Sequence, residues 1–247
     1  MTKKHPPLWI EQQPVIQQVN NRISVLRDDL LEGGSKSRFL PFLIDYDADE
    51  LVFGGPFCGG APLALSVLGR YTGHKISLFY AKRQDLHRRQ IQALKNGATI
   101  FQVPHGYMSN VQAKARRYAE SRGAQFLPLG FDLPQAEEPF VNFMLTVRAK
   151  IGSPSEIWCA AGSGMLARCL GKAFPDSAIK GVAVGLASRH DAQSFPANVE
   201  LLEQPLKFEQ ECKGVSPFPT CPNYERKAWK ICFEQAKPGT LFWNVLA

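Results

Sequence analysis

Gly33-Gly34-Ser35-Lys36 follows Arg27-Asp28-Asp29-Leu30 early in the chain and precedes a predicted helix, Ser37–Leu43. Two glycines let the backbone bend tightly and approach a ligand closely. A helix N-terminus offers free N–H groups and positive potential, which together lower the pKa of a nearby amine. A lysine of lowered pKa suits Schiff-base chemistry, so Lys36 is a candidate catalytic residue. The same string is also typical of a helix N-cap followed by a solvated lysine.

A strand end, a glycine loop and a helix start are predicted further along, in Trp158-Cys159-Ala160-Ala161-Gly162-Ser163-Gly164-Met165-Leu166-Ala167. Such a loop presents backbone N–H groups to a phosphate, with the helix dipole behind them. The chain therefore offers a candidate amine and a candidate phosphate site. Pyridoxal phosphate requires both, because a lysine captures its aldehyde while other groups hold its phosphate.

The remaining sequence alternates between strand and helix patterns, which predicts an α/β fold with parallel sheets. Strands are predicted at 23–26, 51–55, 76–80, 99–103, 125–129, 156–160, 179–184 and 240–246. Helices are predicted at 36–44, 61–71, 87–95, 111–121, 138–150, from the glycine loop to 173, and at 223–236. Residues 186–223 are rich in proline and are expected to be irregular.

The composition places limits on the class of protein. With 247 residues and 45% hydrophobic residues, the chain can bury a substantial core. It has no run of eighteen apolar residues and no apolar signal core at its start, so we expect a cytoplasmic protein without a membrane span. The six cysteines include no Cys-x-x-Cys pair, so free thiols are expected and no metal site is predicted.

The net charge is +7 and the calculated pI is about 9.1. Basic residues gather at Lys82-Arg83, His87-Arg88-Arg89, Lys114 with Arg116-Arg117, and Arg122. This excess of positive charge is compatible with a polyanion partner such as DNA. A merely basic protein explains it equally well, because many of these residues have the spacing of solvated helix faces and no nucleic-acid-binding motif is present.

The order of the motifs resembles that of the fold type II, or tryptophan-synthase-β-like, pyridoxal-phosphate enzymes. The similarity is greatest to the branch of 1-aminocyclopropane-1-carboxylate deaminase and D-cysteine desulfhydrase. In that branch an Arg-Glu-Asp-Leu-like string precedes Gly-Gly-Asn-Lys-x-Arg-Lys, as Arg27–Leu30 precedes Gly33–Arg38 here. A strand ending in Gly-Gly at 51–55, the block 90–98, the loop 160–164 and the closing strand 239–244 follow in the family's order.

The resemblance implies two three-layer α/β/α domains with mainly parallel sheets: a large cofactor-binding domain of residues 1–50 and 135–247, and a small domain of 51–134. It implies that Lys36 forms the Schiff base with pyridoxal 5′-phosphate and moves a proton at the substrate Cα. The phosphate would bind at Ala161, Gly162, Ser163 and Gly164. Ser35, which stands where the family has asparagine, and Asn244 would also serve the cofactor. A homodimer is implied as well.

The chain departs from the family pattern where the substrate is expected to bind. Phe57-Cys58-Gly59-Gly60 replaces a Ser-Asn-His-like string that serves the substrate carboxylate and proton transfer. Cys58 takes the serine position, where it could act as an acid or simply pack, while Gly59 and Gly60 could offer N–H groups to an anion.

The C-terminal part differs too. Ser216–Thr220 resembles a loop lining the family's active site, but the family segment with a Tyr and a Glu near the pyridine ring is expected to be deleted. Thr220 is therefore a candidate for substrate binding, and Asn244 or Thr220 is a candidate partner of the ring nitrogen.

Three functions are compatible with these features. The favoured one is a pyridoxal-phosphate-dependent lyase acting at the Cα of an amino acid, either deaminase- or desulfhydrase-like or a decarboxylase. The second is a phage-type DNA-modifying enzyme that decarboxylates an amino acid attached to thymidine in DNA. The third is a non-catalytic binding protein that kept the fold. A Rossmann-like nucleotide binder fits less well, because Gly162-Ser163-Gly164 lacks the later glycine and the acidic partner of that fingerprint.

Overall fold

The computed structural model describes residues 12–104, 106–185 and 194–246. The chain divides into two compact units: a first unit of Met1–Gln12 with Lys36–Ala136, and a second unit of Gln13–Ser35 with Glu137–Ala247. The predicted small domain, 51–134, lies within the first unit. The prediction of an α/β fold with mainly parallel sheets is confirmed.

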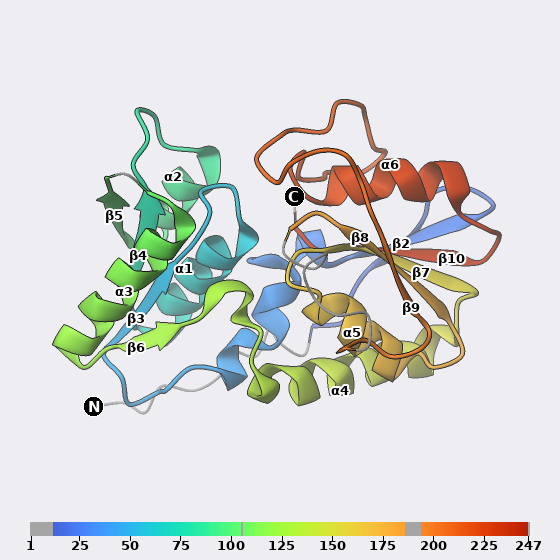
Figure 1. The fold of residues 1–247 in the computed structure, drawn as a ribbon. Coiled ribbons are helices and arrows are strands. Elements are labelled where there is room, and N and C mark those ends of the chain that lie inside the picture. The colour runs from blue at the N-terminus through green and yellow to red at the C-terminus, as the bar shows by residue number, and fades with distance from the viewer. Residues whose placement is uncertain (1–11, 105, 186–193, 247) are drawn as a thin grey trace. The chain divides into compact units, whose positions relative to one another are not determined.

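The second unit is built on a six-stranded sheet (Figure 1). Only β1 pairs antiparallel with its neighbour, and the other strands run parallel. In spatial order the strands are β1 (Ile16–Gln18), β2 (Ile23–Arg27), β10 (Thr240–Asn244), β7 (Glu156–Ala161), β8 (Ala178–Ala183) and β9 (Val199–Leu202). The central strands β10 and β7 are buried throughout, as expected for a sheet covered on both faces.

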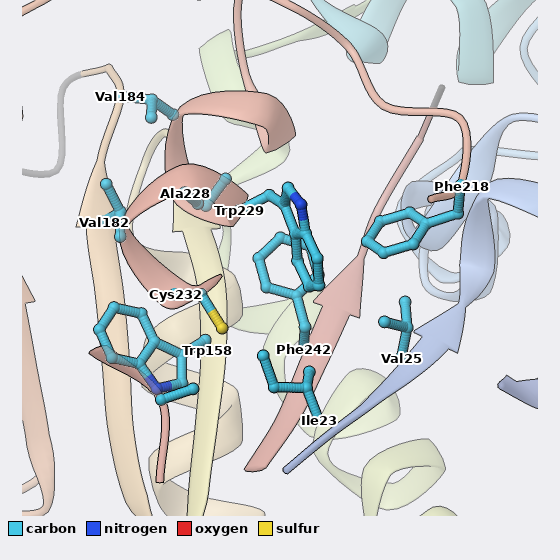
Figure 2. Packing of buried hydrophobic residues seen from close by; sticks show 12 residues of the cluster. Ile23, Val25, Trp158, Val182, Val184, Phe218, Ala228, Trp229, Cys232 and Phe242 are labelled. Carbon is cyan, nitrogen blue, oxygen red and sulfur yellow. The ribbon is translucent and has the colours of Figure 1, made fainter. Parts of the chain in front are cut away.

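Helices cover the two faces of this sheet (Figure 1). On one face lie α4 (Pro134–Ile151) and α5 (Met165–Ala173); on the other lies α6 (Glu225–Gln235). Figure 2 shows the apolar cluster beneath α6, where the Trp229 ring lies 5.2 Å from that of Phe242 and 4.7 Å from that of Phe218. Because Phe242 alternates with its neighbours along β10, Trp243 faces the opposite side and meets Phe143 of α4 at 6.4 Å.

The first unit contains a four-stranded parallel sheet with helices on both faces. Its spatial order is β5 (Thr99–Val103), β4 (Lys75–Ala81), β3 (Glu50–Gly54) and β6 (Gln125–Leu127). One face carries α1 (Gly60–Thr72) and α2 (Arg88–Lys95). The other carries α3 (Met108–Arg122), whose apolar stripe of Val111, Ala115 and Ala119 packs on Val52 and Phe79.

The prediction of one helix over 36–44 was wrong. The structure has two short 3-10 helices there, Gly34–Arg38 and Leu40–Phe42. Pro41 has no backbone N–H and cannot complete an α-helical ladder, so the segment folds as short 3-10 pieces instead. Lys36 consequently lies inside a 3-10 helix and does not precede the N-terminus of an α-helix.

The sequence patterns also missed β1 and β9. Both are short strands at the two edges of the sheet, and neither contains a fully buried residue. Among the described residues no helix is long and apolar enough to cross a membrane. All six cysteines are free and buried, as the prediction of free thiols requires.

Candidate active site

The candidate cofactor residues of the second unit lie at one edge of its sheet. Strands β2, β10, β7 and β8 are parallel, so their carboxyl ends meet at that edge. The segment leading to Lys36 follows β2, Asn244 closes β10, and Gly162-Ser163-Gly164 follows β7. In open parallel α/β sheets the carboxyl ends of the strands are the usual place for a ligand.

A buried hydrogen-bond network holds the residue before Lys36. The Ser35 hydroxyl donates to Asp28 Oδ2 at 2.6 Å, and the Trp243 indole N–H lies 3.2 Å from the same oxygen and 3.1 Å from Ser35 Oγ. Asp28, Ser35 and Trp243 are all buried. The hydroxyl of Ser35, a residue predicted to serve the cofactor, contacts these two neighbours in the structure.

The main chain before Lys36 is also fixed. The Ser35 N–H donates to the Val245 carbonyl at 3.0 Å, directly beyond the end of β10. Gly34 has a φ of +70°, and a Cβ there would lie 2.2 Å from the same carbonyl oxygen. Only glycine fits this approach, so the second glycine of the motif fixes where the half-buried Lys36 begins.

The Arg27-Asp28-Asp29 sequence before the two glycines forms an ion pair and a buried hydrogen bond. Arg27 forms a two-pronged ion pair with Asp29, with Nε–Oδ1 and Nη2–Oδ2 distances both of 2.8 Å. The hydrogen bonds that Arg27 donates to this carboxylate raise the pKa of its guanidinium above the usual value. Asp29 therefore pairs with Arg27, and Asp28 accepts the hydrogen bond from Ser35. The Arg-Asp-Asp sequence thus holds the segment between β2 and Ser35 in place.

The predicted phosphate loop has the geometry that anion binding requires. Gly164 adopts a φ of +92° as the N-cap of α5, and the first intrahelical bond runs from the Arg168 N–H to its carbonyl at 3.0 Å. The backbone N–H groups of residues 165–167 therefore have no acceptor within the helix and point out of its N-terminus. These N–H groups and the glycine cap of the nine-residue helix are compatible with the predicted anion binding.

The loop is packed so closely at Gly162 that this position has no room for a side chain. A Cβ at Gly162 would lie 2.5 Å from the Tyr224 hydroxyl, and a Cβ at Gly185 would lie 2.9 Å from the Gly162 carbonyl. Gly185 follows β8, the strand beside β7. The backbone of the loop is thus supported from the neighbouring strand end and from Tyr224.

Tyr224 and Glu225 are site residues that the sequence reasoning missed. The Tyr224 hydroxyl lies close to Gly162, and burial raises the pKa of that phenol, with the Glu225 charge adding to the rise. Glu225 is itself buried at the start of α6. Tyr224 therefore lies against the glycine loop, and Glu225 is its neighbour along the chain.

Asn244 and Thr220 are brought to the same strand end. The Asn244 amide N–H donates to the Pro219 carbonyl at 2.9 Å, while its Oδ1 is buried and accepts no hydrogen bond from any residue the structure describes. The Thr220 hydroxyl is engaged by Ser216 at 2.8 Å and by Arg226 Nε at 3.2 Å. Of the two predicted ring-nitrogen partners, Asn244 retains an available acceptor.

The predicted substrate loop, Phe57–Gly60, lies in the first unit at the carboxyl end of β3. Arg89 Nη1 donates to the Cys58 carbonyl at 2.8 Å, and the Arg83 guanidinium lies 3.7 Å above the Phe57 ring. The Cys58 side chain is buried, which favours packing over acid catalysis. The Gly59 N–H donates to the Pro56 carbonyl at 3.1 Å, whereas Gly60 is the first residue of α1, where backbone N–H groups have no acceptor within the helix.

Structure comparison identifies the fold. An ACC deaminase homologue matches with a TM-score of 0.71 and 15% identity, covering 97% of this chain and 94% of that one. A hydrogen sulfide-producing enzyme from Fusobacterium nucleatum gives 0.64 and 13%, covering 96% of both chains. A threonine deaminase from T.th. gives 0.59 and 16%, covering 94% of this chain and 76% of that one.

No family model matches the sequence, and no curated protein matches it. At these identities the similarity establishes the fold. The chain has the fold of the fold type II pyridoxal-phosphate enzymes, as the order of its motifs predicts. Among the described residues there is no group of three or more His, Cys, Asp or Glu side chains that could hold a metal ion.

Proposed function

We propose that this protein binds pyridoxal phosphate through Lys36 and is a lyase acting at the Cα of an amino-acid substrate. One observation carries the proposal. The backbone entering Lys36 is fixed to the end of β10 through Ser35 and Val245, and the glycine loop follows the neighbouring strand β7. The segment that leads to Lys36 and the glycine loop thus lie at the ends of adjacent parallel strands of the second unit, in a fold whose solved neighbours include deaminases and a hydrogen sulfide-producing enzyme.

The residues of the site fit the proposed cofactor. The N–H groups at the start of α5 and the Ser163 hydroxyl would hold its phosphate, with Tyr224 supporting the loop from behind. Asn244 Oδ1 is a buried acceptor with no described donor, and the buried carboxylate of Glu225 stands beside Tyr224. These two groups are the candidates for the polar edge of the cofactor ring.

When bound, the cofactor would supply an electron sink for the charge that develops at the substrate Cα. The protein would do the rest. The Lys36 amine would take up or return the proton at that carbon, and the Gly60 end of the substrate loop would orient the carboxylate. Deamination or desulfhydration requires loss of the Cα proton. Decarboxylation instead requires the bond from Cα to the carboxylate to lie perpendicular to the plane of the cofactor ring. The deaminase and hydrogen sulfide-producing relatives favour the first pair of reactions.

The proposal is tested by visible absorption and turnover with the variant Lys36→Ala. We expect the wild-type protein with added pyridoxal phosphate to show an absorption band above 380 nm that borohydride bleaches, and to release ammonia or sulfide from at least one amino acid. Lys36→Ala should lose both, while Lys172→Ala, an exposed lysine on α5, should keep them. Wild-type binding without turnover of any amino acid would instead support the non-catalytic alternative.

A second candidate applies the same chemistry, including decarboxylation, to an amino acid attached to DNA. It is favoured by an uneven charge distribution. Residues 36–136 carry 13 Lys and Arg against 7 Asp and Glu, whereas 13–35 and 137–247 carry 14 of each. Turnover of an amino-acid-modified oligonucleotide, compared with the free amino acid at equal concentration, separates the candidates: equal or faster turnover of the free amino acid argues against DNA as the substrate.

A further inference from the structure

Helix N-termini and basic side chains lie together at the carboxyl edge of the first unit's sheet. Because β3, β4, β5 and β6 are parallel, α1, α2 and α3 all begin at this edge. Each helix N-terminus contributes partial positive charge there. Two loops, residues 82–87 after β4 and residues 104, 106 and 107 after β5, lie at the same edge and include or adjoin exposed cationic and aromatic side chains.

Three exposed cations lie in and next to the first of these loops. They are Lys82, Arg83 and Arg88, and Asp85 is the single acid between them. The loop is held against β5, since the Lys82 N–H donates to the Val103 carbonyl at 2.9 Å and the Arg83 N–H to Gln102 Oε1 at 3.0 Å. The cations are therefore presented from a fixed backbone.

An exposed aromatic residue lies at the end of the second of these loops. Tyr107, at the N-cap of α3, is 80% exposed. Its neighbour Gly106 packs on β4 so closely that a Cβ there would lie 2.5 Å from the Ala81 Cβ, one residue before Lys82. The backbone before Tyr107 is thus held against the strand end from which the cationic loop starts.

Helix α3 carries two further exposed cations. Val111, Ala115 and Ala119 form the buried face of this helix, so Lys114 and Arg117, three residues apart, share the solvent face and are both exposed. Glu120 is the exposed acid on the same helix. Two further cations therefore extend away from Tyr107.

We propose that this edge of the first unit binds single-stranded nucleic acid. Lys82, Arg88, Lys114 and Arg117 contact phosphates, and an unstacked base lies on the Tyr107 ring. Cations that follow a backbone and an exposed aromatic on which a base can stack are the two elements of single-strand binding. A duplex keeps its bases stacked and offers Tyr107 no exposed face. Lys82, Arg88, Lys114, Arg117 and Tyr107 are not residues of the proposed cofactor or substrate site, so the binding and the lyase activity are tested separately.

The test is fluorescence anisotropy with a labelled 20-nucleotide single strand and its duplex. Four phosphate contacts predict a slope of about −2.8 for log affinity against log salt, which is roughly a 50-fold loss of affinity between 50 and 200 mM. The double variant Lys82→Gln, Arg88→Gln should halve the slope. Tyr107→Ala should weaken single-strand binding by roughly 5- to 150-fold at any salt and leave duplex binding unchanged.

The matched control is Lys75→Gln, Lys95→Gln. Both lysines are exposed and lie at the opposite edge of the sheet, at the start of β4 and the end of α2, so the net charge changes by the same amount. The control should keep the wild-type slope. Equal losses in the two double variants, an unaffected Tyr107→Ala, or tighter binding to duplex or to anionic vesicles than to the single strand would each overturn the proposal.

Discussion

Gly34→Ala tests how the fold places Lys36. The left-handed backbone at this position costs a non-glycine residue about 1–2 kcal/mol. The new Cβ would also lie 2.2 Å from the Val245 carbonyl oxygen, so the backbone must move, at a further cost of about 1–3 kcal/mol. That movement removes the bond from the Ser35 N–H to the same oxygen, worth about 1 kcal/mol. We therefore expect a total destabilisation of about 3–6 kcal/mol.

The matched control is Gly152→Ala in the same unit. Gly152 has a φ of +73° and nothing within 4 Å of its Cβ position, so this variant pays the backbone cost alone, about 1–2 kcal/mol. Urea unfolding followed by tryptophan fluorescence gives both values. We also expect Gly34→Ala to weaken binding of added pyridoxal phosphate, while Gly152→Ala leaves it unchanged. Equal stabilities of the two variants would refute the close approach at Gly34.

Four further predictions concern the rest of the site and the core. Asp28→Asn should destabilise by about 1–3 kcal/mol in urea unfolding, because the buried carboxylate accepts bonds from Ser35 and Trp243; a change below about 0.5 kcal/mol would exclude the network. Gly162→Ala should reduce affinity for pyridoxal phosphate in spectroscopic titration, since its Cβ would lie 2.5 Å from the Tyr224 hydroxyl. Adding Tyr224→Phe to this variant should restore part of the lost affinity; wild-type affinity in Gly162→Ala would contradict the packing. Burial raises the pKa of the Cys159 thiol to about 12 from an ordinary value near 9, so iodoacetamide at pH 8.5 should label this residue only after unfolding; rapid labelling in the native protein would disprove its burial. Because the unfolded thiol loses its proton near pH 9 and the native one near pH 12, Cys159 should contribute a progressive loss of stability as the pH rises through this window, which Cys159→Ala should reduce in urea titrations at pH 8 and pH 10.

The sequence predicts most of the strand and helix order because the two sheets are largely parallel. Strands such as β3, β7 and β10 are buried apolar runs bounded by glycine or proline, and the helices between them end at glycines such as Gly73 and Gly123 in the left-handed conformation. The glycine loop after β7 could be located for the same reason, since its position follows from the strand that precedes it.

Other features depend on contacts between distant residues. The edge strands β1 and β9 each pair with one neighbour; β1 has a single apolar residue, and β9 is a four-residue strand within the proline-rich stretch 186–223 that was expected to be irregular. Pro41 breaks the segment after Lys36 into 3-10 turns, so the expected effect of an α-helix N-terminus on the lysine amine has no basis in the structure. Pro41 was the available signal for that correction.

Tyr224 and Glu225 illustrate the same limit. Tyr224 is 62 residues away from Gly162 along the chain, and no spacing rule connects them. Tyr224 lies close to Gly162 because α6, which begins directly after Tyr224, packs on the sheet against β7. A Tyr-Glu pair at the start of an amphipathic helix that follows a proline-rich loop was the one signal in the sequence.

The most direct test of the account is the identity of the lysine that carries the cofactor. The protein is incubated with pyridoxal phosphate, reduced with borohydride, digested with trypsin and analysed by mass spectrometry. A modified Lys36 resists trypsin, so the account predicts a pyridoxyl-bearing peptide from Asp28 to Arg38. Modification of a different lysine, or of none at saturating cofactor, would contradict the assignment of Lys36 and of the function built on it.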